Sequence, residues 1–347
     1  MKVLNSYKSA KDLDGDILSK TKYTLVSVLI LYSLLLAGCG SAGRSPSPPA
    51  QSGHSSNFDA LEEDAQGRED SSQSTALRTT VEQPLFPESD GSLVYSNELL
   101  SLDASSASQG YLLLEYLGEA GKIKLQIKTP DGTLYSYPLK AAQKRSFPLT
   151  GGSGIYQITV LEHAYDDLYA VAFSQEIEAA IEDEFFPFLY PNQFAWYEAD
   201  SKAIEKGKEI SRTSSNDLDY LEQVYLWVIE NITYDNEKAE SVTAEYVPDV
   251  DETLASKKGI CFDYAALMVA MLRSQQIPTK LEVGYSGQVY HAWISVYLKE
   301  FGWVDDIIEF DGSSWTLMDP TLASNNDKKS VGKYVGDGSN YTVKYHY

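Results

Sequence analysis

The chain contains few cysteines and few basic residues for its length. Only two cysteines, Cys39 and Cys261, occur among 347 residues, so no more than one disulfide bridge is possible. Lys and Arg number 28 against 50 Asp and Glu, which gives a formal net charge of −22. Nucleic acid is therefore not expected as a partner, because binding phosphates requires a basic surface. The acidity favours a neutral or basic substrate but does not identify one.

The N-terminal segment lacks an apolar run as long as a typical membrane-spanning helix. Its run extends from Tyr23 to Ala37, whereas a spanning helix needs roughly 20 apolar residues. Lysines precede the run and small residues follow it, as in a secretory signal. Leu36-Ala37-Gly38-Cys39 resembles the lipobox of bacterial lipoproteins. This resemblance implies cleavage before Cys39, a diacylglycerol thioether on its thiol, and a location on the extracytoplasmic face of the cell membrane. A plain membrane-anchor helix is the alternative.

The composition predicts four segments. Residues 1–38 are expected to be a lipoprotein signal peptide. Residues 39–91 hold the lipidated cysteine and a linker rich in Ser, Pro and acidic residues, which has too few large apolar residues to bury a core and is expected to be disordered. A β-rich accessory domain is expected over 92–185 and a second domain over 186–347. The hydrophobic content of 43% is sufficient for two domains with real cores.

Short alternating apolar runs characterise the predicted accessory domain. Ile123, Leu125 and Ile127 alternate with Lys and Gln, which is typical of a strand with one exposed face. Pro130-Asp131-Gly132 then predicts a turn. Several such runs in succession favour a small β-sandwich. His163 has only two aspartates near it in the sequence, so a metal site, which needs three or four ligands, is not expected, and no cofactor is expected either.

Cys261 begins a predicted buried helix. The residues after it are apolar almost all round, which indicates burial on every side of the helix. Another helix is predicted from Asp217, as its N-cap, to about Asn231. The N–H groups and partial positive charge at a helix N-terminus lower the pKa of a cysteine and can stabilise an oxyanion. Cys261 is therefore a candidate nucleophile, and Asp263 is interpreted as an acid that complements the helix dipole.

A base and an orienting carboxylate follow Cys261 in the sequence. His291 opens an alternating segment that predicts a strand, and Asp319 ends another. If these two strands are adjacent and antiparallel, the imidazole and the carboxylate lie side by side. In such a triad His291 would activate the thiol and protonate the leaving group, while Asp319 would hold the imidazole in the required tautomer.

These residues occur in motifs that resemble those of the transglutaminase-like superfamily. The motifs are Gly259-Ile260-Cys261-Phe262-Asp263-Tyr264-Ala265, Ile277-Pro278, Gly284-Tyr285, His291-Ala292-Trp293 and Asp319-Pro320-Thr321, within residues 200–325. The resemblance implies an α+β protein in which an N-terminal β-sandwich-like domain precedes a papain-like core, with the cysteine helix packed on an antiparallel sheet. It also implies Cys261 as nucleophile, His291 as general base and acid, and Asp319 as the orienting residue. Tyr234 is a candidate for the side chain near the oxyanion.

The combined features predict a membrane-anchored thiol enzyme. The acyl group would pass from a thioester on Cys261 either to an amine, as in a cross-linking transferase, or to water, as in a peptidase or amidase. A protein or peptide substrate is expected, for example in the cell envelope. The alternative is a catalytically inactive relative that binds peptides or proteins at the cell surface. The sequence does not predict the oligomeric state.

Overall fold

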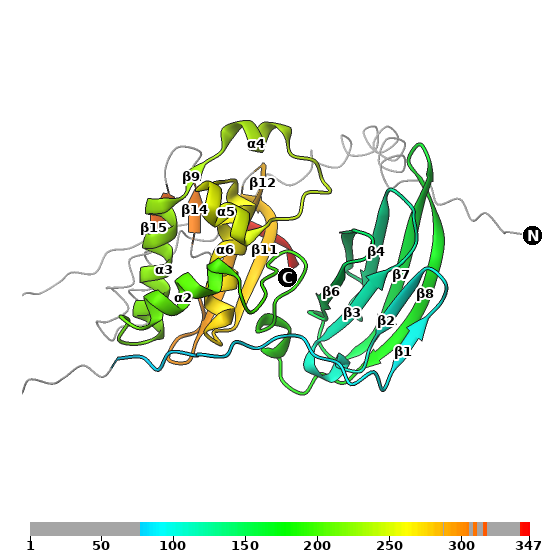
Figure 1. The fold of residues 1–347 in the computed structure, drawn as a ribbon, viewed down its shortest axis with the longest axis horizontal. Coiled ribbons are helices and arrows are strands. Elements are labelled where there is room, and N and C mark those ends of the chain that lie inside the picture. Colours follow the sequence, from blue (N-terminus) through cyan, green and yellow to red (C-terminus); the bar gives the residue numbers. More distant parts are fainter. Residues whose placement is uncertain (1–76, 287, 305–307, 311–314, 318–340) are drawn as a thin grey trace, which may run out of the picture. The chain divides into compact units, whose positions relative to one another are not determined.

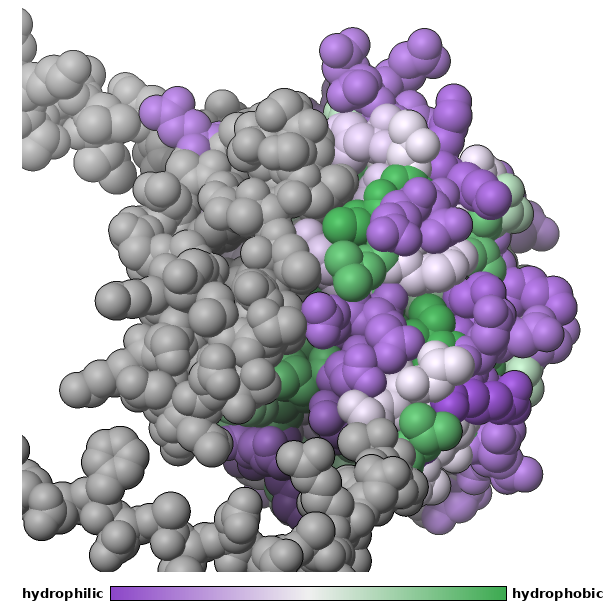
Figure 2. Space-filling model, turned by 90° about the vertical axis from the view of Figure 1, so that its left-hand side faces the viewer, coloured by the Kyte–Doolittle hydropathy of each residue, from purple (hydrophilic) through white to green (hydrophobic). Residues whose placement is uncertain are grey.

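The computed structural model describes residues 77–286, 288–304, 308–310, 315–317 and 341–347. All of these residues belong to one compact unit. Cys39, Asp319 and the predicted signal peptide lie outside the described residues. Within the described part of the chain, no helix is long and apolar enough to cross a membrane. On the face that Figure 2 shows, hydrophilic side chains predominate among the described residues, and apolar side chains are scattered between them.

The first part of the fold is a β-sandwich of two four-stranded antiparallel sheets (Figure 1). The strand orders are β1-β2-β3-β6 and β5-β4-β7-β8. The elements of this part are β1 (Val94–Ser96), β2 (Leu100–Asp103), the 3-10 helix η2 (Ala107–Gln109), β3 (Tyr111–Tyr116), β4 (Ile123–Lys128), β5 (Leu134–Leu139), β6 (Lys144–Pro148), β7 (Gly154–Tyr165) and β8 (Leu168–Ala179). This confirms the predicted sheet-rich region.

The alternating apolar residues of β4 are buried on one face of the strand, as predicted. Ile123, Leu125 and Ile127 are buried, and the residues between them are half-buried. Across the ladder Leu125 pairs with Tyr137 of β5, and Tyr137 is buried against the ring of Phe147 in the facing sheet. The predicted turn after β4 includes Gly132, whose φ of +94° is one that residues with a side chain rarely adopt.

The second part of the fold places helices on an antiparallel sheet. The strand order of this sheet is β13-β12-β11-β16, and every neighbouring pair is antiparallel. The elements are η3 (Phe186–Phe188), α2 (Lys202–Ser211), α3 (Asp217–Asn231), β9 (Thr233–Tyr234), α4 (Asn236–Ser241), α5 (Val250–Ser256), β10 (Lys258–Gly259), α6 (Cys261–Ser274), β11 (Thr279–Ser286), β12 (Val289–Leu298), β13 (Gly302–Val304), β14 (Ile308–Phe310), β15 (Trp315–Leu317) and β16 (Tyr341–His346).

Helix α6 is the central element of this second part. It contacts β11 and β12 on one side and α2, α3 and α5 on the other (Figure 1). All its residues from Asp263 to Ser274 are buried, as the apolar composition predicted. The α+β class and a cysteine helix packed on an antiparallel sheet are thus confirmed. Burial on both sides fixes the position of the helix, and Cys261 is its first residue.

Two local predictions differ from the structure. Asn216, not Asp217, is the N-cap of α3, because its side chain accepts the N–H of Asp219. Among the described residues, strand β15 pairs with β14 in a two-stranded sheet and does not extend the ladder of β12. Strands that lie so close together in sequence close a hairpin at little entropic cost, which favours this pairing.

A buried arginine joins the C-terminal end of α6 to its surroundings. The guanidinium of Arg273 donates to the main-chain oxygens of Thr279, Tyr190 and Tyr347, over 2.6–2.9 Å. Burial lowers its pKa to about 10, so it remains charged at neutral pH. No carboxylate side chain of the described residues forms a salt bridge with it. Main-chain oxygens therefore supply the hydrogen bonds that a buried charge requires.

Candidate active site

Helix α6 begins at Cys261 because the carboxylate of Asp263 holds the preceding turn. This carboxylate is fully buried and accepts the N–H of Ile260 at 2.8 Å. Gly259 permits the close approach, since a Cβ atom there would lie 2.7 Å from the Cβ of Asp263. Gly259 also pairs with Tyr234 in the parallel β9–β10 ladder. The start of the helix is thus joined to the chain segment that carries Tyr234.

The same carboxylate binds two side chains from the segment before α5. Lys238 of α4 contacts it at 2.7 Å, and the hydroxyl of Tyr246 donates to its other oxygen. The ammonium of Lys238 also lies 4.4 Å from the centre of the Tyr246 ring. Asp263 therefore does more than complement the helix dipole, because it ties α4 and the loop after it to the Cys261 turn. Nothing in the sequence pattern indicated Lys238 or Tyr246.

The thiol of Cys261 is largely enclosed. Burial raises its pKa above the usual value, and hydrogen bonds from the N–H groups of Ala292 and Phe262 lower it only in part. The sequence predicted a net lowering by the helix N-terminus; in the structure, burial outweighs that effect. The contact with Ala292 places the sulfur beside β12, the strand that carries His291, because Ala292 directly follows His291.

His291 lies on β12, opposite Gly284 of β11. Its side chain is buried, and burial lowers its pKa to about 4, so the imidazole is neutral at pH 7 and able to accept a proton. Its ring is stacked near that of Trp293, with ring centres 6.2 Å apart. The Nε2 atom is buried and has no hydrogen-bond partner among the described residues. A buried nitrogen of this kind requires a partner.

Tyr234 lies directly at the thiol. Its hydroxyl accepts the main-chain N–H of Cys261 and forms a hydrogen bond with the Cys261 side chain. Burial and the nearby thiol together raise the pKa of Tyr234, so the hydroxyl keeps its proton at neutral pH. A hydroxyl that keeps its proton next to a nucleophile is able to donate to an oxyanion. The structure thus places the candidate named from the sequence beside Cys261.

Cys261 and His291 line the same cavity, which has a volume of about 590 Å³. Among the described residues that line it, none is Asp, Glu, Lys or Arg, and seven are aromatic. The aromatic residues are Phe194, Tyr234, Tyr246, Phe262, Tyr290, Tyr345 and Tyr347. Strand β5 of the sandwich also contributes to the wall, through Ser136 and Pro138. The described part of the lining is therefore uncharged and surrounds a thiol and an imidazole.

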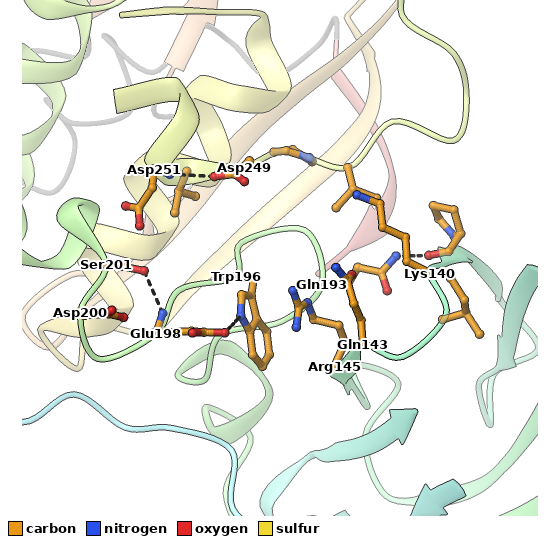
Figure 3. A pocket seen from close by; sticks show the side chains of 15 residues that line it. Lys140, Gln143, Arg145, Gln193, Trp196, Glu198, Asp200, Ser201, Asp249 and Asp251 are labelled. Carbon is orange, nitrogen blue, oxygen red and sulfur yellow. Dashed lines mark hydrogen bonds between the residues drawn. The ribbon is translucent and has the colours of Figure 1, made fainter. Parts of the chain in front are cut away.

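A second cavity adjoins the first at Pro138 and has a volume of about 350 Å³ (Figure 3). Its lining is strongly polar: the guanidinium of Arg145 lies 4.3 Å from the centre of the Trp196 ring, and the Trp196 Nε1 donates to Glu198 at 3.1 Å. Asp249 and Asp251 lie across the cavity from Arg145 (Figure 3). No cysteine or histidine is among the described residues that line this cavity, so they include no nucleophile and base of the kind found at Cys261.

The described residues contain no cluster of three or more His, Cys, Asp or Glu side chains that could hold a metal ion. Of the predicted triad, the structure brings Cys261 and His291 to one cavity, and Asp319 lies outside the described residues. The sequence did not indicate the part that Ser136 and Pro138 play in the cleft wall.

Replacing Gly284 by alanine is expected to disturb β11, the strand on which Gly284 pairs with His291 of β12. A Cβ atom at this position would lie 2.0 Å from the main-chain oxygen of Thr342 on β16, so the strands must move apart. We expect the free energy of unfolding to fall by about 1–3 kcal/mol, measured by urea unfolding. Gly121→Ala is the matched control, because nothing lies within 4 Å of a Cβ atom there. Equal stability of the two variants would contradict the close approach of β11 and β16.

Comparisons with known proteins identify the second part of the fold. Residues 204–306 match the model of the transglutaminase-like superfamily. A UPF0252 protein from Methanocaldococcus jannaschii is 32% identical over 120 residues, which are 30% of this chain and 34% of that protein. The chain thus matches about a third of that relative's length.

Solved structures give partial similarities only. A candidate cysteine protease from Cytophaga hutchinsonii is 14% identical, with a TM-score of 0.29, over 61% of this chain and 78% of that one. Red sea bream transglutaminase is 13% identical, with a TM-score of 0.23, over 62% of this chain and 48% of that one. These scores are too low to support any argument, so the assignment rests on the family match. That match shows that residues 204–306 form a domain of the transglutaminase-like superfamily.

Proposed function

We propose that this protein is a thiol enzyme that transfers acyl groups through a thioester on Cys261. The observation that carries the proposal is the shared cavity of Cys261 and His291, in which the N–H next to His291 contacts the sulfur. A neutral imidazole is suited to this role, because it is able to take the thiol proton as the sulfur attacks. The burial that raises the thiol pKa makes such a base necessary.

The proposed reaction has two halves. In the first, the sulfur attacks the substrate carbonyl, His291 takes the thiol proton, and negative charge develops on the carbonyl oxygen. The hydroxyl of Tyr234 would donate to that charge, and the main-chain N–H of Cys261, which the Tyr234 hydroxyl accepts in the resting site, would become a second donor. The leaving group departs with the proton from His291 and leaves a thioester. In the second half, His291 takes a proton from an amine or water as it attacks the thioester, the C–S bond breaks, and the proton passes from His291 to the departing sulfur, which restores the Cys261 thiol.

Asp319 is proposed as the partner of His291. The buried Nε2 atom has no partner among the described residues, and a carboxylate at that atom would fix the tautomer that presents the other nitrogen to the thiol. It would also raise the pKa of His291 from the value of about 4 that burial gives, which would make the imidazole a stronger base.

The acetylation of Cys261 by p-nitrophenyl acetate tests this proposal. We expect a burst of p-nitrophenolate and one acetyl group on Cys261, located by mass spectrometry of the full chain in detergent. His291→Gln should slow the burst by about 10²–10⁴-fold, as expected for the loss of a general base. Adding a primary amine during turnover then distinguishes transfer to the amine from hydrolysis. Acetylation only at lysines would contradict the proposal.

A peptide-binding module without catalysis is the second candidate. The feature that favours it is the burial of both reacting groups, which holds the thiol and the imidazole neutral in the resting state. Its aromatic, uncharged cleft would still bind an apolar segment. In this case Cys261 would remain unacetylated under the conditions above.

We also propose that the chain is anchored to the extracytoplasmic face of the cell membrane by a lipid on Cys39. The lipobox-like sequence before this residue supports the proposal. Replacing Cys39 by alanine is expected to abolish incorporation of radiolabelled palmitate and to keep the N-terminal segment uncleaved. Cys261→Ala is the matched control and should retain the label. Labelling that follows Cys261 instead would contradict the proposal.

A further inference from the structure

Strand β5 of the sandwich has one edge that no described strand occupies. It is the terminal strand of its sheet and pairs only with β4. Ser136 and Pro138 of this strand also line the cavity that contains Cys261. An edge strand presents main-chain N–H and C=O groups that another extended chain is able to pair with. The reactive thiol thus shares its cleft with a sheet edge.

The register of the ladder shows which main-chain groups face this edge. The N–H of Thr129 donates to the oxygen of Thr133 at 2.9 Å, so these two residues form a hydrogen-bonded pair. Such pairs alternate with non-bonded pairs along an antiparallel ladder. Ser136 and Gln126, three positions further along, are therefore a non-bonded pair. The N–H and C=O of Ser136 point away from β4, toward the open edge.

The neighbouring position supports this assignment. Pro138 is the next residue with the same orientation, and it has no N–H to donate, which is typical of an edge strand. Its carbonyl oxygen is already bound by the side chain of Gln193. Ser136 is thus the position in the cleft wall at which both a donor and an acceptor face the edge.

We infer that the substrate is an extended polypeptide that pairs with the main chain of Ser136 along the edge of β5 and presents an uncharged residue to Cys261. This inference rests on the proposed function of the thiol. The uncharged residue follows from the described lining of the cleft, which offers no charged side chain to pair with a charged group. Charged residues further along the polypeptide would pass Pro138 into the second cavity, where Arg145 and several carboxylates are available (Figure 3).

The rate at which peptidyl chloromethyl ketones alkylate Cys261 tests the inference. The probe is acetyl-Ala-Ala-Phe chloromethyl ketone, with the lysine and aspartate analogues for charge, and iodoacetamide as a reagent without a peptide backbone. Ser136→Pro removes the edge N–H without removing a ladder hydrogen bond, and Ser136→Ala is the matched control that keeps it. We expect Ser136→Pro to slow the phenylalanine probe by about 3–10-fold, as for one lost hydrogen bond, and to leave iodoacetamide and Ser136→Ala unchanged. The charged analogues should react more slowly than the phenylalanine probe.

A second form of the probe keeps the test valid if Ser136→Pro does not fold. Each amide nitrogen of the peptidyl probe is methylated in turn, and at the position that pairs with Ser136 the methyl group removes the donor to the Ser136 oxygen. At that position, methylation should slow the alkylation of Cys261 in the protein without substitutions by about 3–10-fold. If iodoacetamide reacts rapidly but neither change affects the peptidyl probe, the edge-pairing inference is wrong and the proposed function stands. If Cys261 is inert to both reagents, both proposals are wrong.

Discussion

Replacing Arg273 by methionine is expected to lower the free energy of unfolding by about 3–5 kcal/mol. The guanidinium is fully buried and satisfies the oxygens of Thr279, Tyr190 and Tyr347. Methionine fills similar space but leaves these oxygens without a donor in a site that water does not reach. Urea unfolding followed by tryptophan fluorescence measures the change.

Arg212→Met is the control for this experiment. Arg212 lies on the surface, where it contacts Glu82 at 3.3 Å and both side chains are more than half exposed. Exposed ion pairs of this kind contribute less than about 1 kcal/mol. A loss of similar size in the two variants would show that Arg273 does not hold α6, β11 and the segment around Tyr190 together.

Replacing Asp319 by asparagine is expected to slow acetyl transfer to Cys261 by about 10²–10⁴-fold. Asparagine keeps the size of the side chain but removes the negative charge, so the imidazole would keep the low pKa that burial gives it. The burst with p-nitrophenyl acetate measures the rate, and urea unfolding checks that the variant folds.

Asp327→Asn is the matched control, since it removes a carboxylate from the same part of the sequence. It should transfer acetyl groups at the rate of the unchanged protein. If Asp319→Asn is as active as this control, another group orients His291, and the proposed triad is wrong in its third member.

Much of the fold was predictable because it follows from local patterns. The alternation of Ile123, Leu125 and Ile127 predicted β4, and the apolar run after Cys261 predicted the buried helix α6. Each pattern reflects burial of one face or of all faces, which a single segment reveals by itself. The N-cap of α3 was misplaced by one residue because Asn216 and Asp217 are both good capping residues.

The contacts that the sequence did not indicate join segments far apart in the chain. Lys238 and Tyr246 reach the buried Asp263, and Ser136 reaches the cleft of Cys261 from another part of the fold. The periodicity of apolar residues does not predict these long-range contacts, because they depend on how whole helices and strands pack against one another. The lowered pKa predicted for Cys261 was wrong in direction for a related reason: helix position is visible in the sequence, whereas the extent of burial is not.

The measurement that tests the central claim most directly is the pH dependence of Cys261 alkylation by iodoacetamide, with and without His291→Gln. With His291 as base, the rate should change little between pH 7 and 9, because the imidazole is already neutral there. Without it, only the thiolate reacts, and the raised thiol pKa makes the rate rise about tenfold per pH unit. The same steep rise in both proteins would show that His291 does not activate Cys261 and would contradict the proposed thiol enzyme.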